Sequence, residues 1–289
     1  MRLLDAIRFS SEYLGKSGID DSLADAELIV LHAAGMERLS AYIDNPEISG
    51  KMFEDIKKLL ERRGKGEPVQ YIIEHVDFLG LKIKVGRGVL IPRPETELLA
   101  LEAIKEVRSQ KSKVKGKGRN LTTIILDLCA GSGCISLALA RELPDADIYG
   151  TDISIAAIRH AKKNADINGI KNVTFLRGSL FEPLAESAAF DLIVSNPPYI
   201  KTSDIEGLQR EIKDWEPVEA LDGGPDGLDF YRRIFSEAGN RLKKGGKIIL
   251  EIGSGQSADV KKFAEQSGFR DISFIKDFAG IDRILKAEV

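Results

Sequence analysis

The chain has 289 residues, of which 43% are hydrophobic, so it can bury a large core within one large domain or two unequal domains. Its 42 Lys and Arg residues are offset by 45 Asp and Glu residues, and the resulting net charge of -3 gives no overall basic field that would attract polyanions. This balance argues against a stand-alone DNA enzyme. No apolar run is long enough to span a bilayer and no signal peptide precedes the chain, which predicts a cytoplasmic protein with no membrane partner.

Apolar and charged residues alternate at helical spacing over residues 1 to about 65. Helix-breaking residues interrupt this pattern at residues 15–18, at Gly35 and at Asn45-Pro46. We expect a small helical domain over residues 1–66, which binds a substrate or partner or else only steadies the fold.

Pro68 opens a segment with a different pattern. Residues 69–73 and 81–85 are rich in β-forming side chains and flank Phe78-Leu79-Gly80. They predict a β-hairpin within a connector over residues 67–93, which joins the helical domain to a third part over residues 94–289. Pro94 suits the first position of a helix, because its missing N–H costs nothing there.

Residues 109–120 carry five Lys and Arg side chains among Gly and Ser. This composition predicts a solvated loop, and we prefer a plain linker to a nucleic-acid contact.

Strands and helices alternate from Leu121 onward, a pattern typical of a parallel α/β sheet. The expected strands cover residues 123–128, 148–152, 173–176, 190–194 and 245–251, and the expected helices cover residues 135–142, 156–168 and 258–266. Two short closing stretches, residues 272–275 and 283–285, are expected to pair with each other.

A glycine-rich turn follows the first of these strands. Gly131 and Gly133 let the backbone approach a ligand closely, but Ser136 occupies the place of the third glycine in a dinucleotide fingerprint. A nicotinamide cofactor is therefore disfavoured. Asp127 is expected to organise the loop backbone. Asp152 ends the next strand, where a carboxylate can accept ribose hydroxyls, although it could instead cap the helix that follows.

The apolar strand at residues 190–194 leads into Asn196-Pro197-Pro198-Tyr199. The two prolines cannot donate ladder hydrogen bonds, so the strand must stop pairing there. An Asn-Pro-Pro-Tyr turn at this place resembles the signature of S-adenosylmethionine-dependent enzymes that methylate adenine N6, cytosine N4 or a glutamine side-chain amide. S-adenosylmethionine has no pyrophosphate, so the short Gly-x-Gly turn suffices for it.

Such a turn can activate a poor nucleophile. An amide nitrogen delocalises its lone pair, and it must gain positive charge when it attacks a sulfonium methyl. If the Asn196 side-chain oxygen and the Pro197 carbonyl accept the two substrate N–H bonds, they aim the lone pair at the methyl carbon, each contributing about 2 to 4 kcal/mol. Tyr199 is expected to pack against the planar amide.

The cysteines and histidines indicate no further chemistry. Cys129 and Cys134 do not have the spacing of a redox or zinc pair and point to a reducing compartment, while the three histidines are scattered among helical-looking segments. No metal is expected.

Most of the chain resembles the HemK/PrmC family, the protein-(glutamine-N5) methyltransferases that modify peptide chain release factors. The matching segments are Pro68-Val69-Gln70-Tyr71-Ile72, Phe78-Leu79-Gly80-Leu81, Val89-Leu90-Ile91-Pro92-Arg93-Pro94-Glu95-Thr96-Glu97, Ser195 to Ile200, Glu216-Pro217, Ala220-Leu221-Asp222-Gly223-Gly224, Asp226-Gly227-Leu228 with Tyr231, and Glu251-Ile252-Gly253 with Gln256. Together they are more specific than any single motif.

The resemblance implies a Rossmann-like α/β methyltransferase domain with a seven-stranded sheet, preceded by a small helical domain and a β-hairpin connector. It implies S-adenosylmethionine as cofactor and the glutamine of a Gly-Gly-Gln loop as substrate. Separately, we expect a monomer. By position, the cofactor contacts are Asp127, Cys129, Ala130, Gly131, Ser132, Gly133, Asp152, Leu180 and Asn196. The glutamine contacts are Asn196, Pro197, Pro198 and Tyr199, and further candidates for lining the site are Arg93, Pro94, Glu95 and Thr96.

Other functions stay open. Adenine N6 methylation of DNA or RNA shares the Asn-Pro-Pro-Tyr turn but should bring a basic groove or a target-recognition domain. A glutamine methyltransferase acting on a ribosomal protein usually differs at residues 93–97. A non-catalytic module that grips release factors or ribosomes would not need the cofactor loop.

Overall fold

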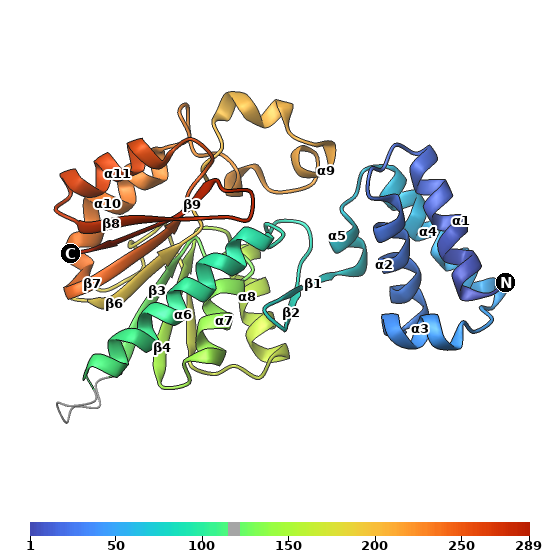
Figure 1. Cartoon of the computed structure of the whole chain (residues 1–289), viewed down its shortest axis with the longest axis horizontal. Coiled ribbons are helices and arrows are strands. Elements are labelled where there is room, and N and C mark those ends of the chain that lie inside the picture. The colour runs from blue at the N-terminus through green and yellow to red at the C-terminus, as the bar shows by residue number, and fades with distance from the viewer. Residues whose placement is uncertain (115–121) are drawn as a thin grey trace. The chain divides into compact units, whose positions relative to one another are not determined.

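The computed structural model describes residues 1–114 and 122–289 (Figure 1). The chain divides into two compact units, the first comprising Met1–His75 and Leu208–Trp215, and the second Val76–Gly207 and Glu216–Val289. The predicted three-part division into residues 1–66, 67–93 and 94–289 stays a prediction. None of the helices in the described part of the chain is both long and apolar enough to cross a membrane.

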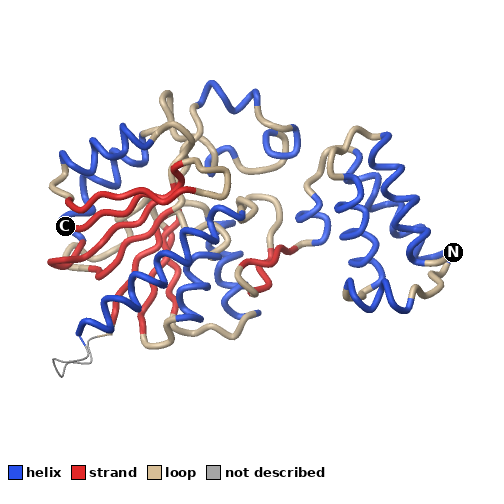
Figure 2. The backbone as a smooth tube through the Cα atoms, viewed as in Figure 1, coloured by secondary structure: helices blue, strands red, loops and turns tan. Residues whose placement is uncertain are grey.

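The first unit is helical (Figure 2). Its helices are α1 (Leu3–Lys16), α2 (Ser22–Ala34), α3 (Arg38–Asp44), α4 (Gly50–Gly64), α5 (Val69–Ile73) and the short α9 (Arg210–Lys213). The predicted breaks are confirmed, since Gly35 and Asn45 end α2 and α3 in the left-handed conformation. Arg63 is buried and pairs with Asp25 at 2.5 Å and with Glu211 at 2.6 Å, which holds the α9 segment in this unit.

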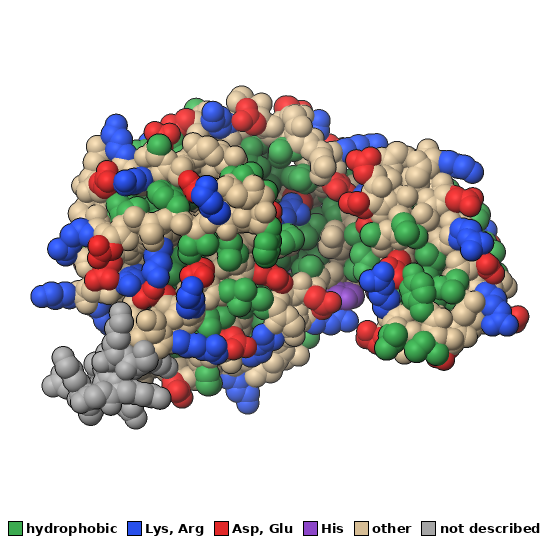
Figure 3. Space-filling view, viewed as in Figure 1, with side chains coloured by type: hydrophobic (Ala, Val, Ile, Leu, Met, Phe, Trp, Pro, Cys, Tyr) green, Lys and Arg blue, Asp and Glu red, His purple; other side chains and the backbone are tan. Residues whose placement is uncertain are grey.

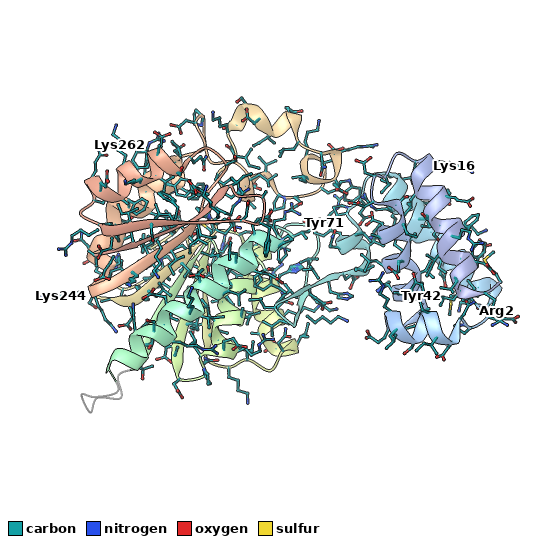
Figure 4. The ribbon with its side chains drawn as sticks, in the orientation of Figure 1. Arg2, Lys16, Tyr42, Tyr71, Lys244 and Lys262 are labelled. Atoms are coloured by element: carbon teal, nitrogen blue, oxygen red, sulfur yellow. The ribbon has the colours of Figure 1, made fainter. Side chains whose placement is uncertain are left out.

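The prediction of an extended segment at residues 69–73 is wrong. These residues form α5, which carries Tyr71 in Figure 4, and the Pro68 carbonyl accepts from the backbone N–H groups of Tyr71 and Ile72. Val69 and Ile72 pack into the core of the helical unit. Burial there outweighs the preference of β-branched residues for strands, which is weak and depends on context.

The helical unit also exposes apolar side chains. Figure 3 shows hydrophobic groups over α2 and α3, and Leu39 and Ile43 are each 73% exposed. Tyr42 lies beside them on α3 and is half exposed (Figure 4). Exposed apolar groups that gather in one place are typical of interaction surfaces.

A short hairpin begins the second unit. It consists of β1 (His75–Phe78) and β2 (Leu81–Lys84), so the expected hairpin exists but starts later than predicted, and His75 lies in a strand. Asn164 holds β2 against helix α8 (Ile155–Ile167), since its side chain accepts from Lys84 N at 2.8 Å and donates to Lys84 O at 3.0 Å.

A seven-stranded sheet forms the centre of the second unit (Figure 1). Its strands are β3 (Thr123–Leu128), β4 (Ala146–Asp152), β5 (Val173–Arg177), β6 (Phe190–Ser195), β7 (Leu242–Glu251), β8 (Arg270–Lys276) and β9 (Asp282–Glu288). Their order is β5-β4-β3-β6-β7-β9-β8, and all neighbours are parallel except the two pairs that involve β9. The predicted pairing of the two closing strands is confirmed, as is the fold class.

Helices cover both faces of this sheet (Figure 1). One face carries α6 (Pro94–Val114), α7 (Cys134–Glu142) and α8 (Ile155–Ile167), and the other carries α10 (Asp229–Arg241) and α11 (Ser257–Gln266). Two 3₁₀ helices, at Thr202–Gly207 and Val218–Ala220, lie in the long connection between β6 and α10.

Helix α6 begins at Pro94, as predicted, but it runs further than expected. Residues 109–114 were predicted to be part of a loop, and they continue the helix instead. The polar composition that predicted a loop does not exclude a helix, since Lys and Gln have high helix propensity. Residues 115–120, the rest of the predicted basic loop, lie outside the described residues.

Candidate active site

The Asn196 turn and the glycine turn lie at the carboxyl ends of neighbouring strands. Strands β3 and β6 are parallel and pair Leu128 with Ser195. The hydroxyl of Ser195 also donates to the carbonyl of Leu128 at 2.7 Å, so the two strand ends are tied together immediately before both turns. In open α/β sheets, this edge is where ligands bind.

The glycine turn has a left-handed backbone at Cys129, Gly131 and Gly133, with φ of 58°, 55° and 80°. A Cβ added to Gly133 would lie 2.9 Å from the Phe175 ring, so this glycine is needed for packing of the turn against the helix and strand behind it. The Cβ position of Gly131 is open instead, since its nearest heavy atom is 4.0 Å away. Gly131 therefore leaves room for a ligand.

Asp152, at the end of β4, binds the glycine turn directly. One side-chain oxygen accepts from Gly131 N at 2.8 Å and the other accepts from Ser154 N at 2.8 Å. Ser154 is the N-cap of α8, and its hydroxyl accepts from Ala157 N, so the alternative in which Asp152 caps this helix is wrong. Burial raises the pKa of Asp152, while the two backbone N–H groups oppose that rise.

Asp127 is fully buried below the turn. Its Oδ2 accepts from Ser136 N at 3.1 Å and from Ser136 Oγ at 2.6 Å, so the serine in place of a third glycine fixes the start of α7 to the strand. Burial raises the pKa of Asp127 to about 7. Among the described residues, its Oδ1 finds no hydrogen-bond partner.

A cavity of about 440 Å³ lies in the second unit beside these two turns. This volume falls within the range of about 300 to 1,000 Å³ that is typical of small-molecule sites. The predicted site residues that line it are Thr96, Cys129, Ala130, Gly131, Ser132, Asp152, Leu180, Asn196 and Pro198. The predicted residues that do not line it are Arg93, Pro94, Glu95, Asp127, Gly133, Pro197 and Tyr199.

The side chain of Asn196 is held by two residues that sequence reasoning did not connect with it. Its Nδ2 donates to the Thr96 hydroxyl at 3.0 Å, and that hydroxyl donates to Glu251 Oε2 at 2.8 Å. Tyr199 also turns to this carboxylate, donating to Oε1 at 3.2 Å. Glu251 belongs to the motif Glu251-Ile252-Gly253 but was not among the predicted site residues. The feature of the sequence that could have identified Glu251 is its place at the carboxyl end of β7, the strand that pairs with β6.

Residues from the β6–α10 connection pack behind the Asn196 turn. Gln256, the N-cap residue of α11, links this connection to the turn, since it donates to the Tyr199 carbonyl at 2.9 Å and to the Gly227 carbonyl at 3.1 Å. A Cβ on Gly223 would lie 2.8 Å from Tyr199 Cα and 2.9 Å from the Pro198 carbonyl oxygen. The connection therefore approaches the turn so closely that only glycine fits at residue 223.

Arg93 does not line the cavity and instead forms an ion pair with the buried Glu216. The second oxygen of Glu216 accepts from Ile91 N at 3.2 Å. This pair fixes the segment before α6 next to the cavity residue Pro217, so Arg93 shapes the rim of the site.

The cysteines in and after the glycine turn are not set up as nucleophiles. Burial raises the pKa of the Cys134 thiol to about 12 and raises that of Cys129 as well, so both stay protonated. Within residues 1–110 and 122–289, no group of three or more His, Cys, Asp and Glu side chains is placed to hold a metal ion.

Two family models match the chain. Residues 5–73 match the PrmC N-terminal domain, and residues 120–251 match a methyltransferase domain. Among solved structures, the hMettl16 catalytic domain superposes with a TM-score of 0.56 at 18% identity, covering 79% of this chain and 80% of that one. The T. thermophilus 16S rRNA methyltransferase RsmC, solved with AdoMet and guanosine, gives a TM-score of 0.50 at 24% identity, covering 74% of this chain and 49% of that one. Both similarities show that the fold is shared, and nothing beyond the fold.

Curated relatives match over nearly the whole chain. The release factor glutamine methyltransferase of Thermodesulfovibrio yellowstonii is 46% identical over 285 residues, which cover 99% of this chain and 97% of the relative. Bacterial relatives with the same name from other organisms also match across nearly all of this chain. The chain therefore belongs to the family of release factor glutamine methyltransferases.

Proposed function

We propose that this protein transfers a methyl group from S-adenosylmethionine to the side-chain amide nitrogen of a glutamine, in the Gly-Gly-Gln motif of a peptide chain release factor. The observation that carries the proposal is the position of the Asn196 carboxamide, on the wall of the same cavity as Gly131 and Asp152. The 46% identity to a release factor glutamine methyltransferase supports the substrate class.

The cavity residues suit S-adenosylmethionine. Gly131 leaves an open place on the wall, and Asp152 offers carboxylate oxygens that retain acceptor capacity for ribose hydroxyls beside their backbone bonds. Leu180 and Ile153 also line the cavity, and their apolar side chains suit contact with the adenine ring. AdoMet is also bound by the T. thermophilus enzyme of similar fold. The cofactor supplies a methyl group on a sulfonium, which is already activated for transfer.

The substrate amide is then oriented by this chain's own groups. Because Thr96 takes one N–H of Asn196, the Asn196 oxygen is left to accept a substrate N–H, and the Pro197 carbonyl is the proposed second acceptor. Two fixed acceptors in the plane of the amide direct its lone pair out of that plane, toward the methyl. No strong base is required, since an N-protonated amide loses its proton readily after transfer.

The first unit is proposed to bind the release factor. Its exposed apolar side chains on α3, including Leu39 and Ile43, suit contact with a protein partner. The net charge of -3 does not favour a nucleic-acid partner instead. That the enzyme acts in the cytoplasm as a monomer stays a prediction.

The direct test is methyl transfer to a purified release factor. We expect mass spectrometry of the digested factor to place one added methyl on the glutamine of the Gly-Gly-Gln peptide, and none when that glutamine is replaced by alanine. Transfer to DNA but not to the factor would support adenine methylation instead. Transfer to a ribosomal protein alone would support the other glutamine substrate.

The cofactor site gives a separate prediction. Replacing Asp152 by alanine removes an acceptor from the proposed ribose site and a partner from Gly131 N. Hydrogen bonds to charged groups contribute about 1.5 to 3 kcal/mol, so we expect the Kd for S-adenosylmethionine to rise about 10- to 100-fold. Isothermal titration calorimetry measures this directly. An unchanged Kd in a folded variant would remove Asp152 from the cofactor site.

A further inference from the structure

The hydrogen bonds around Thr96 leave only one arrangement for the Asn196 carboxamide. A threonine hydroxyl has a single proton, and Thr96 donates it to Glu251 Oε2 at 2.8 Å. The oxygen of Thr96 can therefore only accept from Asn196, so it selects the Nδ2 end of the amide, at 3.0 Å. The Oδ1 end of Asn196 must then point away from Thr96.

Glu251 is itself held in place from several sides. It is 1% exposed, and its backbone carbonyl accepts from the Tyr231 hydroxyl at 3.0 Å. Tyr199 donates to the side-chain oxygen that Thr96 does not use. A buried carboxylate with both oxygens engaged has little freedom to rotate, and it transmits this fixed orientation to Thr96.

We propose that Glu251 and Thr96 are positioning residues, which set the direction of the Asn196 carboxamide with its nitrogen inward and its oxygen toward the cavity. The inference rests on the proposed function, because the outward oxygen matters as an acceptor for the substrate amide. Glu251 does not line the cavity, and the hydroxyl of Thr96, which does line it, is engaged by Glu251 and Asn196. The effect of Glu251 and Thr96 on the reaction passes through Asn196.

Protonation of Glu251 removes this constraint. A protonated Glu251 carboxyl can donate to the Thr96 oxygen. The Thr96 hydroxyl can then donate its own proton to Asn196 Oδ1, so the carboxamide is free to adopt the flipped orientation. Burial raises the pKa of Glu251 to about 7, and Glu95 opposes its ionisation, whereas Thr96, Tyr199 and Arg283 favour it. The other titratable groups that face it are Tyr231 and Cys134, which both stay protonated. We therefore expect the carboxamide to be correctly oriented above about pH 7.

The kinetic test compares three variants. Thr96→Val keeps the shape of the side chain but loses the hydroxyl, and we expect kcat to fall about 10- to 100-fold because Asn196 is no longer aligned. The KM for the release factor and the Kd for S-adenosylmethionine should stay near their wild-type values. Thr96→Ser restores the hydroxyl and should recover most of kcat. In Glu251→Gln, the acidic side of the pH profile of kcat should show one ionisation fewer than in the wild type. Asp127 is unchanged in this variant, so its ionisation affects the variant and the wild type alike.

A second measurement does not depend on activity. In the ¹⁵N-labelled protein, the Asn196 side-chain NH₂ signal is identified by its loss in Asn196→Asp. We expect this signal to shift between pH 6 and 8 in the wild type, and we expect most of this shift to be absent from Glu251→Gln. Exchange of its protons with solvent should be faster in Thr96→Val than in Thr96→Ser.

The outcomes separate two kinds of failure. If the signal behaves as expected but the wild type transfers no methyl to the release factor, the proposed function is wrong and the positioning network stands. If the wild type is active and Thr96→Val matches it in kcat, the inference is overturned. Equal loss of kcat in Thr96→Val and Thr96→Ser would also overturn it, since packing would then be the cause.

Discussion

Replacing Asn196 by alanine is expected to lower kcat about 10²- to 10³-fold, the loss seen when one preorganised hydrogen-bonding group is removed from an active site. Asn196 lines the cavity and its carboxamide nitrogen donates to Thr96, so alanine removes the proposed acceptor that aims the substrate nitrogen. Affinity for S-adenosylmethionine should change little, because the glycine turn and Asp152 remain. Single-turnover methylation of the release factor and calorimetry with the cofactor measure the two effects separately.

A matched control for this change is Asn240→Ala. Asn240 is exposed on α10, so the same substitution there should leave both quantities unchanged. A loss of cofactor affinity in Asn196→Ala that equals the loss of kcat would mean that Asn196 serves cofactor binding. Retention of wild-type kcat would remove the Asn196 turn from the chemistry.

Replacing Gly223 by alanine is the second change with a large expected effect. The new methyl group would lie 2.8 Å from Tyr199 Cα, and 2.9 Å from the carbonyl oxygens of Pro198 and Gly227. All three atoms belong to the backbone, so the clash cannot be relieved by a side-chain rotation. Over-packing of this kind costs about 1 to 3 kcal/mol in the free energy of unfolding. A displacement of the Asn196 turn by about 1 Å can cost a further 100-fold in kcat.

Gly207→Ala is the corresponding control. No heavy atom lies within 4 Å of a Cβ added at Gly207, and its backbone is not left-handed, so thermal denaturation and kcat should both match the wild type. If Gly223→Ala is as stable and active as Gly207→Ala, the close approach of the connection to the Asn196 turn does not position that turn.

Much of the second unit could be predicted from the sequence, because its signals are local. The apolar strands, the glycine turn after β3 and the proline-ended strand β6 all appear where hydrophobic periodicity and chain-stopping residues place them. Parallel strands bring their carboxyl ends to one edge, so Gly131, Asp152 and Asn196 were expected together, and all three line the cavity. The family resemblance is confirmed by the full-length relatives.

The network behind Asn196 could not be predicted in the same way. Thr96 lies 100 residues before Asn196 in the chain, and Glu251 lies 155 residues after Thr96. No local pattern links residues so far apart. The direction of Tyr199 was equally inaccessible, since a sequence shows that an aromatic ring follows the prolines but not that its hydroxyl turns inward to Glu251.

The path of the chain between β6 and α10 affects how this protein can be shortened. The polypeptide leaves the second unit at Gly207, contributes Leu208–Trp215 to the helical unit, and returns at Glu216, the partner of Arg93 at the cavity rim. An isolated fragment beginning at Val76 would keep Glu211 but lose Arg63, its buried partner. The two units are thus joined by three crossings of the backbone, and no single cleavage point separates them.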